Sequence, residues 1–415
     1  MRTTLDWPGK AAAFALGRES ISSSRPSPHL LRRGERAVPE IGGNHLVVGD
    51  NLPALTALLC THRGRVKVVY IDPPYNTGSA LAYKDHGHDH ASWLSFMTPR
   101  LMLARELLRD DGVLFLHLDD GESAWAQLLG HEIFGEENSL GTLIHQRAKG
   151  GGNSPSFVRG HDYVHVWGKD AEQVGPFLTE KKAPAKLEVI DGRRMLVETD
   201  VLRAGFGRYV RGQERRLMYE DILAVKGAKK LAEVDAKLAS GDYILRPWSG
   251  GKHAVVRVTP AEKASSKLYS IIKALGGHND LDRLGLGGVF SYPKPVDLVK
   301  TLVASQTFFD PDAIVLDFFA GSGTTAEAVM AANRRDEGRR TFILVQTPEP
   351  LRRRVGARVS GGAVAAGVPG GAAGADDSAG AEFTTISELT AERIRRAADI
   401  LAPGLAFDEF VVGED

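Results

Sequence analysis

Short apolar runs alternate with stretches of helical periodicity in two separate parts of the chain. Apolar runs bounded by turn residues are typical of buried strands, and apolar residues three or four positions apart predict one buried helix face. The predicted strands are residues 45–50, 66–71, 113–118, 140–146, 163–167, 313–317 and 341–346. The predicted helices are residues 52–59, 93–108, 122–134, 294–303 and 324–333. Strands and helices that alternate at these lengths predict a doubly wound, mostly parallel α/β sheet with helices on both faces.

The regular pattern is interrupted in three places. Residues 1–40 show weak periodicity and predict a flexible N-terminal arm. Residues 171–288 contain short mixed segments, turn residues and many basic side chains, and they predict an inserted region. Between residues 355 and 382, 17 of 28 residues are Gly or Ala, which predicts a low-complexity loop over residues 351–383. The remaining parts are two halves of one sheet domain, residues 41–170 and 289–350, and a C-terminal helix and tail, residues 384–415.

The composition excludes several classes of protein. Hydrophobic residues make up 43% and charged residues 25% of the 415 residues, as in ordinary globular domains. The single cysteine, Cys60, excludes an internal disulfide bond and a cysteine-rich zinc site. No apolar run approaches the ~18 residues of a membrane span, so we expect an intracellular protein.

Charge is distributed unevenly although the total is neutral. Lys and Arg together number 52, as do Asp and Glu. Between residues 141 and 300, however, there are 27 basic and 18 acidic residues. This local excess indicates a surface that meets phosphate groups, and a solvated, loop-rich insertion explains it equally well.

The segment Gly-Ser-Gly-Thr-Thr-Ala, residues 321–326, follows a predicted strand and opens a predicted helix. This G-x-G-x-x-A pattern places backbone N–H groups at a helix start, where a nucleotide-like ligand can lie. A dinucleotide fits the pattern, as does any cofactor with an adenosine moiety, whereas a P-loop would require the missing Gly-Lys-Ser/Thr. Glycines that only allow close packing of the strand against the helix are the alternative interpretation.

The segment Asp-Pro-Pro-Tyr, residues 72–75, ends another predicted strand, at the sheet edge where open α/β sheets bind their ligands. Prolines have no backbone N–H, so their carbonyls and the Asp72 carboxylate form a rigid edge of acceptors. Such an edge suits an exocyclic amino group, which offers donors, while Tyr75 supplies a flat face on which a planar base can stack. A rigid turn with Tyr75 as a local plug is the alternative.

Together these motifs resemble those of the DNA amino-methyltransferases that use S-adenosylmethionine. Residues 72–75 resemble their catalytic motif, and Phe-Ala-Gly-Ser-Gly, residues 319–323, resembles their cofactor motif. The catalytic motif comes first and a basic region separates the two, as in the permuted β class. The chain is also similar to the modification subunits of type III restriction systems at residues 49–52, 71–78, 133–138, 293–295, 316–325 and 342–346.

The resemblance implies a circularly permuted, Rossmann-like methyltransferase sheet with residues 171–288 as its target-recognition region. In this fold the strand at 313–317 is the central first strand. The second to fifth strands are residues 341–346, 45–50, 66–71 and 113–118. Asp72 and Phe319 are then expected at adjacent strand ends, at the topological switch point.

The resemblance also implies roles for single residues. Tyr75 would stack on a base flipped out of double-stranded DNA, while Asp72 and the Pro73 carbonyl accept hydrogens of its exocyclic amine. Asp50 is expected near the cofactor's adenine, Lys294 near its carboxylate, and Asp317 near its ammonium group through water. The full set of catalytic residues is Asp72, Pro73, Pro74 and Tyr75. The cofactor-binding set is Asp50, Lys294, Asp317, Phe319, Gly321, Gly323, Thr324 and Gln346, with Glu349 as the alternative to Gln346 at the ribose. The DNA-binding set is Asn76, Arg193, Arg194, Arg211, Arg215 and Arg216.

Several alternatives remain open at this point. The resemblance favours methylation of adenine N6, because Asp at the first motif position is more typical of the family's adenine enzymes, and methylation of cytosine N4 is the runner-up. A dinucleotide-dependent oxidoreductase explains the glycine turn only, and a DNA-binding subunit without activity is a further alternative. The expected partners are double-stranded DNA and a restriction subunit, and a homodimer is left open. No metal is expected, because the chemistry needs none and the histidines at 86, 88 and 90 are only a compositional hint.

Overall fold

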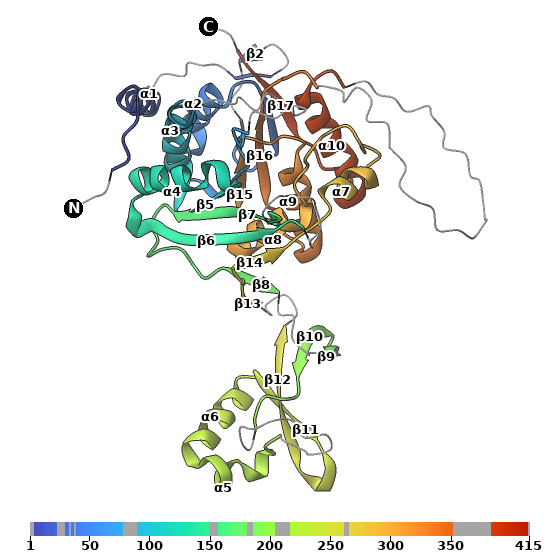
Figure 1. Ribbon diagram of the computed structural model, residues 1–415. Coiled ribbons are helices and arrows are strands. Elements are labelled where there is room, and N and C mark those ends of the chain that lie inside the picture. Colours follow the sequence, from blue (N-terminus) through green and yellow to red (C-terminus); the bar gives the residue numbers. More distant parts are fainter. Residues whose placement is uncertain are drawn as a thin grey trace. The chain divides into compact units, whose positions relative to one another are not determined.

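The protein is described here by a computed structural model, which covers residues 4–22, 30–32, 35–36, 39–77, 89–148, 157–180, 186–203, 216–260, 265–351 and 383–413 (Figure 1). Its contacts divide the chain into two compact units. The first unit consists of Met1–Phe177 and Tyr269–Asp415, and the second of Leu178–Leu268. Most of the low-complexity segment predicted at 351–383 lies outside the described residues.

The first unit is built on one large sheet. Among the described residues it has eleven strands in the order β14-β6-β7-β5-β4-β15-β16-β3-β17-β1-β2. Their bounds are β1 (Leu30–Arg32), β2 (Glu35–Arg36), β3 (His45–Val48), β4 (Val66–Ile71), β5 (Leu108–Leu118), β6 (Ser139–Gln146), β7 (His161–Gly168), β14 (Ile271–Lys273), β15 (Ile314–Asp317), β16 (Thr341–Gln346) and β17 (Asp408–Val412). The six strands from β5 to β17 in this order pair in parallel, and β7 is antiparallel to β5 and β6. The predicted α/β class and the order of the five predicted core strands are confirmed.

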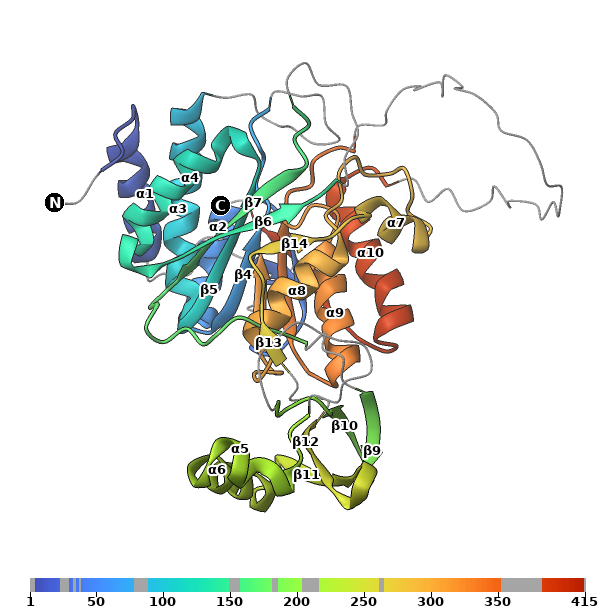
Figure 2. The same ribbon diagram turned by 60° about the horizontal axis from the view of Figure 1, so that its bottom comes forward.

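Helices cover both faces of this sheet (Figure 2). One face carries α1 (Lys10–Ser22), α2 (Asn51–His62), α3 (His90–Leu107) and α4 (Asp120–Phe134), and the other carries α8 (Val296–Thr307), α9 (Thr324–Asp336) and α10 (Ile386–Leu401). Every residue of β4 and of β16 is buried, because helices exclude water from both faces of these strands. None of the helices among the described residues is both long and apolar enough to span a membrane.

The prediction of a flexible arm over residues 1–40 is wrong for the described part of that segment. Residues 10–22 form α1, which packs against α3. Trp7 is buried just before this helix, and its indole N–H donates to Ser95 Oγ at 3.0 Å. The helix was missed because it buries small residues, Ala13 and Gly17, which give little hydrophobic periodicity. A Cβ on Gly17 would lie 2.4 Å from the Met102 sulfur and 3.3 Å from Pro99 Cα, so a larger residue there would displace the Met102 side chain.

The predicted bounds of the insertion, residues 171–288, were too wide. The second unit spans only Leu178–Leu268, and the flanking residues belong to the first unit. After the insertion, β14 pairs in parallel with β6, and α7 (Gly277–Arg283) follows before Lys294. A three-residue strand and a short helix are below the length at which periodicity gives a signal. The C-terminal tail predicted at 384–415 also contains β17, which joins the sheet beside β3.

The second unit, described by itself, is a small sheet with helices. Its four-stranded sheet has the order β11-β12-β10-β9, and β8 pairs with β13 in a separate ribbon. The bounds are β8 (Leu178–Glu180), β9 (Lys186–Ile190), β10 (Arg193–Glu198), α5 (Ile222–Lys226), α6 (Ala228–Ala239), β11 (Tyr243–Pro247), β12 (His253–Pro260) and β13 (Ser265–Lys267). Two apolar clusters support it, one around Val256 and one around Ile222. The unit therefore has its own core.

Helix α10 is fastened to the first unit by a buried arginine. Thr385 and Glu388 form a capping box at its start. Arg393 is fully buried, and its Nε donates to Glu327 Oε2 of α9 at 2.9 Å. Its Nη1 donates to the hydroxyl oxygens of Ser322 and Thr324, each at 2.8 Å. This arginine therefore links the C-terminal helix to the turn that precedes α9.

We expect Arg393→Ala to lower the free energy of unfolding by about 3 kcal/mol. Among the described residues, it leaves the buried Glu327 carboxylate with the partly exposed Arg283 as its one remaining ion partner. Urea unfolding measures this. Arg395→Ala on the same helix is the matched control, because Arg395 is half exposed and its surface pairs are worth about 1 kcal/mol or less. Equal losses in the two variants would contradict a special role for Arg393.

Candidate active site

Two neighbouring parallel strands bring the predicted motifs together. β4 ends at Ile71 and is followed by Asp72, while β15 ends at Asp317 and is followed by the glycine turn. These two strands pair in parallel, so their carboxyl ends lie at the same edge of the sheet. One cavity at that edge is lined by residues of both motifs. Of the predicted cofactor-binding residues, all except Gly323 line it, together with Asp72, Pro74 and Glu349.

The glycine turn is held by side chains of its own sheet. Gln346, the last residue of β16, accepts a hydrogen bond from the Gly321 N–H at 2.7 Å. Gly321 and Gly323 have φ values of 52° and 84°, in the left-handed region that favours glycine. A Cβ on Gly323 would lie 3.2 Å from the Thr390 methyl group, so this glycine faces α10 and not the cavity. A Cβ on Gly321 would lie 3.6 Å from a Phe290 ring atom and 3.9 Å from the Phe319 carbonyl oxygen, which is ordinary contact, and Gly321 lines the cavity.

Asp317 stabilises this turn by accepting hydrogen bonds from it. It is buried, and its two carboxylate oxygens accept hydrogen bonds from the Phe319 N–H at 3.0 Å and from the Thr325 hydroxyl at 2.5 Å. Burial raises the pKa of Asp317 to about 7, and the charge of nearby Asp72 adds to the increase. Asp317 borders the cavity, but both of its oxygens already have protein partners. Its expected water-mediated contact with a cofactor ammonium group stays a prediction.

Asp72 forms an ion pair across the cavity. Its Oδ2 lies 2.6 Å from Lys294 Nζ, while its buried Oδ1 has no hydrogen-bond partner among the residues that the structure describes. Lys294 Nζ also lies 4.8 Å from the centroid of the Tyr75 ring. The sequence analysis placed Lys294 beside the cofactor carboxylate and did not foresee this pair. Because Lys294 borders the cavity as well, its ammonium group can serve either a carboxylate ligand or Asp72.

The remaining residues of the catalytic motif are fixed by neighbouring helices. The Trp93 indole N–H of α3 donates to the Pro74 carbonyl at 2.9 Å, so that carbonyl is already used. Asn76 has a positive φ of 61°, and its amide donates to Glu122 Oε1 at 2.7 Å. This bond directs Asn76 toward α4, and its predicted contact with DNA stays a prediction. The Pro73 carbonyl therefore remains the backbone acceptor proposed for the motif.

Asp50 and its neighbours form the opposite rim. Asp50 caps α2 by accepting from the Leu52 N–H at 2.7 Å, and it pairs with Arg100 at 3.1 Å. Sequence reasoning missed Asn51 and Arg100, although Asn51 lies in a motif segment that it quoted. The Asn51 amide donates to the Phe318 carbonyl at 2.8 Å and its oxygen accepts from Arg100 Nε at 2.5 Å, which ties the start of α2 to the strand end of β15. The one sequence signal for this link is the Asp-Asn pair, Asp50 and Asn51, at the end of a predicted strand.

A second cavity adjoins the motif on its other side. It is lined by Tyr75, and Lys294 borders both cavities. His145 of β6 and Asp162 of β7 form part of its wall, with His117 of β5 behind them. Burial lowers the pKa of His117 and that of His145, the latter to about 4. Sequence analysis proposed none of these three residues.

The predicted DNA-contacting arginines all fall in the second unit. Arg193 opens β10 and is exposed, and Arg194 follows it in the same strand. Arg216 lies 4.6 Å from the centre of the Trp248 ring, and its Nε donates to the Thr199 carbonyl at 3.1 Å. Arg211 and Arg215 lie outside the described residues. The unit carries 19 Lys and Arg against 12 Asp and Glu, which agrees with the local basic excess in the sequence.

The permuted sheet and the cavity shared by its two motifs are those of a Rossmann-like methyltransferase domain. The chain belongs to the DNA methylase family, whose model matches residues 66–356.

Curated relatives place this chain near modification enzymes. It is 28% identical to the type III restriction-modification enzyme EcoPI Mod subunit of Escherichia phage P1, over 84% of this chain and 64% of the relative. It is 30% identical to the StyLTI Mod subunit of Salmonella typhimurium, over 86% of this chain and 57% of the relative. It is 28% identical to the type II methyltransferase M.KpnI of Klebsiella pneumoniae, over 74% of this chain and 81% of the relative. The chain thus spans roughly three fifths of the length of these two Mod subunits.

The raised pKa of Asp317 predicts a pH dependence of stability. The folded protein keeps a proton up to about pH 7 that the unfolded chain loses near pH 4, so the free energy of unfolding falls as the pH rises between these values. The slope is at most about 1.4 kcal/mol per pH unit, and no further loss is expected above the folded pKa. Asp317→Asn should remove this slope.

Urea unfolding between about pH 5 and about pH 8 measures the effect, which follows from proton linkage. Asp312→Asn is the control, because Asp312 is exposed and paired with Arg339, and it should keep the slope of the parent protein. Parallel stability curves for the parent and Asp317→Asn would show that Asp317 is ionised in the folded protein.

Proposed function

We propose that the protein is a site-specific DNA methyltransferase that transfers a methyl group from S-adenosylmethionine to the N6 amino group of adenine. One observation carries the proposal. Asp72 and Pro74 of the acceptor edge and residues 319–322 of the glycine turn border a single cavity. An edge of acceptors binds an amino group, and a glycine turn at a helix start binds a nucleotide-like cofactor.

The residues around the cavity fit this cofactor. Phe96 and Phe319 offer apolar ring faces to an adenine, and Asp50 offers acceptors for its amino group. Gln346 and Glu349 offer acceptors for ribose hydroxyl groups, and Lys294 offers a cation for a carboxylate. Gly321 lines the cavity without a side chain of its own, so a ligand can lie against the turn. The cofactor would supply an electrophilic methyl group carried on a sulfonium.

The chain's own residues would then orient the amine. The unpartnered Asp72 Oδ1 and the Pro73 carbonyl accept the two amino hydrogens, which directs the nitrogen lone pair away from the ring and toward the methyl group. Tyr75 stacks on the base from the second cavity, which has to receive it outside the duplex. No side chain forms a covalent bond in this step. Positioning and fixed dipoles therefore provide the rate enhancement.

The target base and the partners belong to the same proposal. Adenine N6 is preferred to cytosine N4 because Asp72 opens the motif, and both amines would meet the same acceptors. The names of the relatives describe Mod subunits of restriction-modification enzymes, and we propose double-stranded DNA and a restriction subunit as partners of this chain. A DNA substrate agrees with a location in the bacterial cytoplasm.

We expect Asp72→Asn to lower methyl transfer by about 100-fold to 1,000-fold or more, because the amide replaces one acceptor oxygen with a donor. Sequencing of genomic DNA with modification detection, from cells that express each variant, reports base and recognition site together. Asp312→Asn, which lies on the surface away from the cavity, should retain full modification. Binding of S-adenosylmethionine, read as an increase in melting temperature, should persist in Asp72→Asn. Full modification in Asp72→Asn would exclude the mechanism. Modified cytosine in cells that express the parent protein would assign the reaction to cytosine N4.

Arg193 tests the role of the second unit in DNA binding. If its guanidinium meets a phosphate, Arg193→Ala should reduce the slope of log affinity against log salt concentration by about one unit. Arg246→Ala is the matched control in the same sheet, because Arg246 is already neutralised by both carboxylate oxygens of Glu188. Fluorescence anisotropy with a DNA duplex across a salt series measures both slopes. Identical slopes for the two variants would remove Arg193 from the DNA-binding surface.

A further inference from the structure

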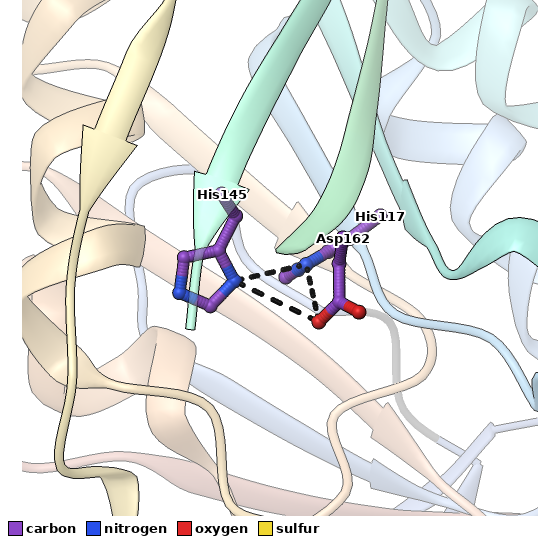
Figure 3. A group of neighbouring side chains, drawn as sticks. All are labelled: His117, His145 and Asp162. Carbon is purple, nitrogen blue, oxygen red and sulfur yellow. Dashed lines mark hydrogen bonds and ion pairs between the residues drawn. The ribbon is translucent and has the colours of Figure 1, made fainter. Parts of the chain in front are cut away.

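Three buried side chains converge beside the second cavity (Figure 3). They are His117 of β5, His145 of β6 and Asp162 of β7, which lie on three neighbouring strands. The His117 Nε2 and His145 Nδ1 atoms are 3.3 Å apart, and Asp162 Oδ2 lies 3.7 Å from the former and 3.8 Å from the latter. Methyl transfer as proposed above uses none of these atoms.

The outer nitrogen of each histidine is held by the protein. His145 Nε2 lies 2.9 Å from the Ala274 carbonyl, which can only accept, so this nitrogen carries the hydrogen. On the neutral ring, the Nδ1 lone pair therefore points into the cluster. His117 Nδ1 lies 3.0 Å from the Tyr70 hydroxyl, which fixes the orientation of that ring. Histidines that bind metals usually have such an outer partner, a carbonyl or another polar group, on the second nitrogen.

The 3.3 Å contact between His117 Nε2 and His145 Nδ1 is a long hydrogen bond, and the same distances also fit ligands around a central ion. Two atoms bound tetrahedrally at the usual zinc distances lie roughly 3.4 Å from each other. A carboxylate that accepted a charge-assisted hydrogen bond from a histidine would lie at about 2.8 Å, yet Asp162 Oδ2 is 3.7 Å or more from both rings. The three atoms thus lie within 4.8 Å of one another, close enough to share one ion.

We propose that His117, His145 and Asp162 bind a divalent transition-metal ion, with Zn²⁺ as the first candidate. Imidazole nitrogens with a carboxylate oxygen are a donor set that suits this class of ion. Three protein ligands leave a fourth position, and it faces the second cavity because His145 and Asp162 form part of that wall. The ion would join three strands next to Tyr75, whose ring centroid lies 6.4 Å from that of His117.

Two cations near the cluster limit its affinity. Arg147 Nε lies 3.2 Å from Asp162 Oδ1, and Lys294 borders the same cavity while it is paired with Asp72. Each cation has a carboxylate, but their charge still opposes a bound dication. We therefore expect a site that survives purification less well than a closed cysteine site and that refills on addition of metal.

The test uses the full chain after removal of metal with a chelator. Competition of Zn²⁺ with a chromophoric chelator should show one tight site per chain, and Co²⁺ should give visible absorption bands of a four-coordinate site. Asp162→Asn and His145→Gln should each weaken Zn²⁺ binding by about 100-fold, because each removes one of only three protein ligands. His165→Gln is the matched control, since His165 is equally buried on β7 but bonds Ser123 and Thr142. It should bind Zn²⁺ as the parent does.

Absence of a tight Zn²⁺ site in the folded parent protein would overturn the proposal. Equal affinity in the parent and in folded Asp162→Asn and His145→Gln would overturn it too, because the metal would then bind elsewhere. If a variant fails to fold by circular dichroism, the Co²⁺ spectrum of the parent still decides, since octahedral aquo-cobalt absorbs only weakly. These measurements do not involve methyl transfer, so their failure and a failure of the proposed function are distinguishable.

Discussion

The parallel pairing of β4 with β15 is the constraint on which the site depends. Leu316 lies beside Val69 in this pair, and both strands are buried along their whole length. Apolar packing therefore sets where each strand ends, and the polar motifs follow directly after those ends. A shift of two residues in this register would move one motif by roughly 7 Å relative to the other and separate them. The chemistry of the cavity is thus placed by residues that have no part in it.

The two carboxyl groups at this sheet edge, those of Asp317 and Asp72, differ in burial and in hydrogen-bond partners. Asp317 is buried beneath the turn, where burial raises its pKa to about 7 and its oxygens accept from a backbone amide and a hydroxyl. Asp72 is only partly buried and has an ammonium partner in Lys294. One carboxyl group therefore shapes the backbone while the other remains available to a ligand. The two carboxyl groups differ in role because Asp317 is buried whereas Asp72 is partly exposed and paired with Lys294.

The core of the fold and the two motifs could be predicted because their signals are local. The strands at 66–71 and 313–317 are continuous apolar runs, and family resemblance supplied their order. Helix α1 was missed because small residues make its contacts, and β14 because three residues give no period. The cluster of His117, His145 and Asp162 could not be found, because its members lie on separate strands and each alone looks like a strand residue. The Lys294–Asp72 pair was missed for the same reason, since it joins residues far apart in sequence.

The order of the strands has a consequence for synthesis on the ribosome. β3 and β4 emerge early, but their parallel neighbours β16, β17 and β15 follow roughly 250 residues or more later. During translation the edges of these apolar strands stay without their final partners, while the second unit, which has its own core, is complete first. Nascent chains of this kind expose surfaces that favour association or chaperone binding. The arrangement that unites the two motifs in the folded protein thus delays completion of its largest sheet until β17 has been synthesised.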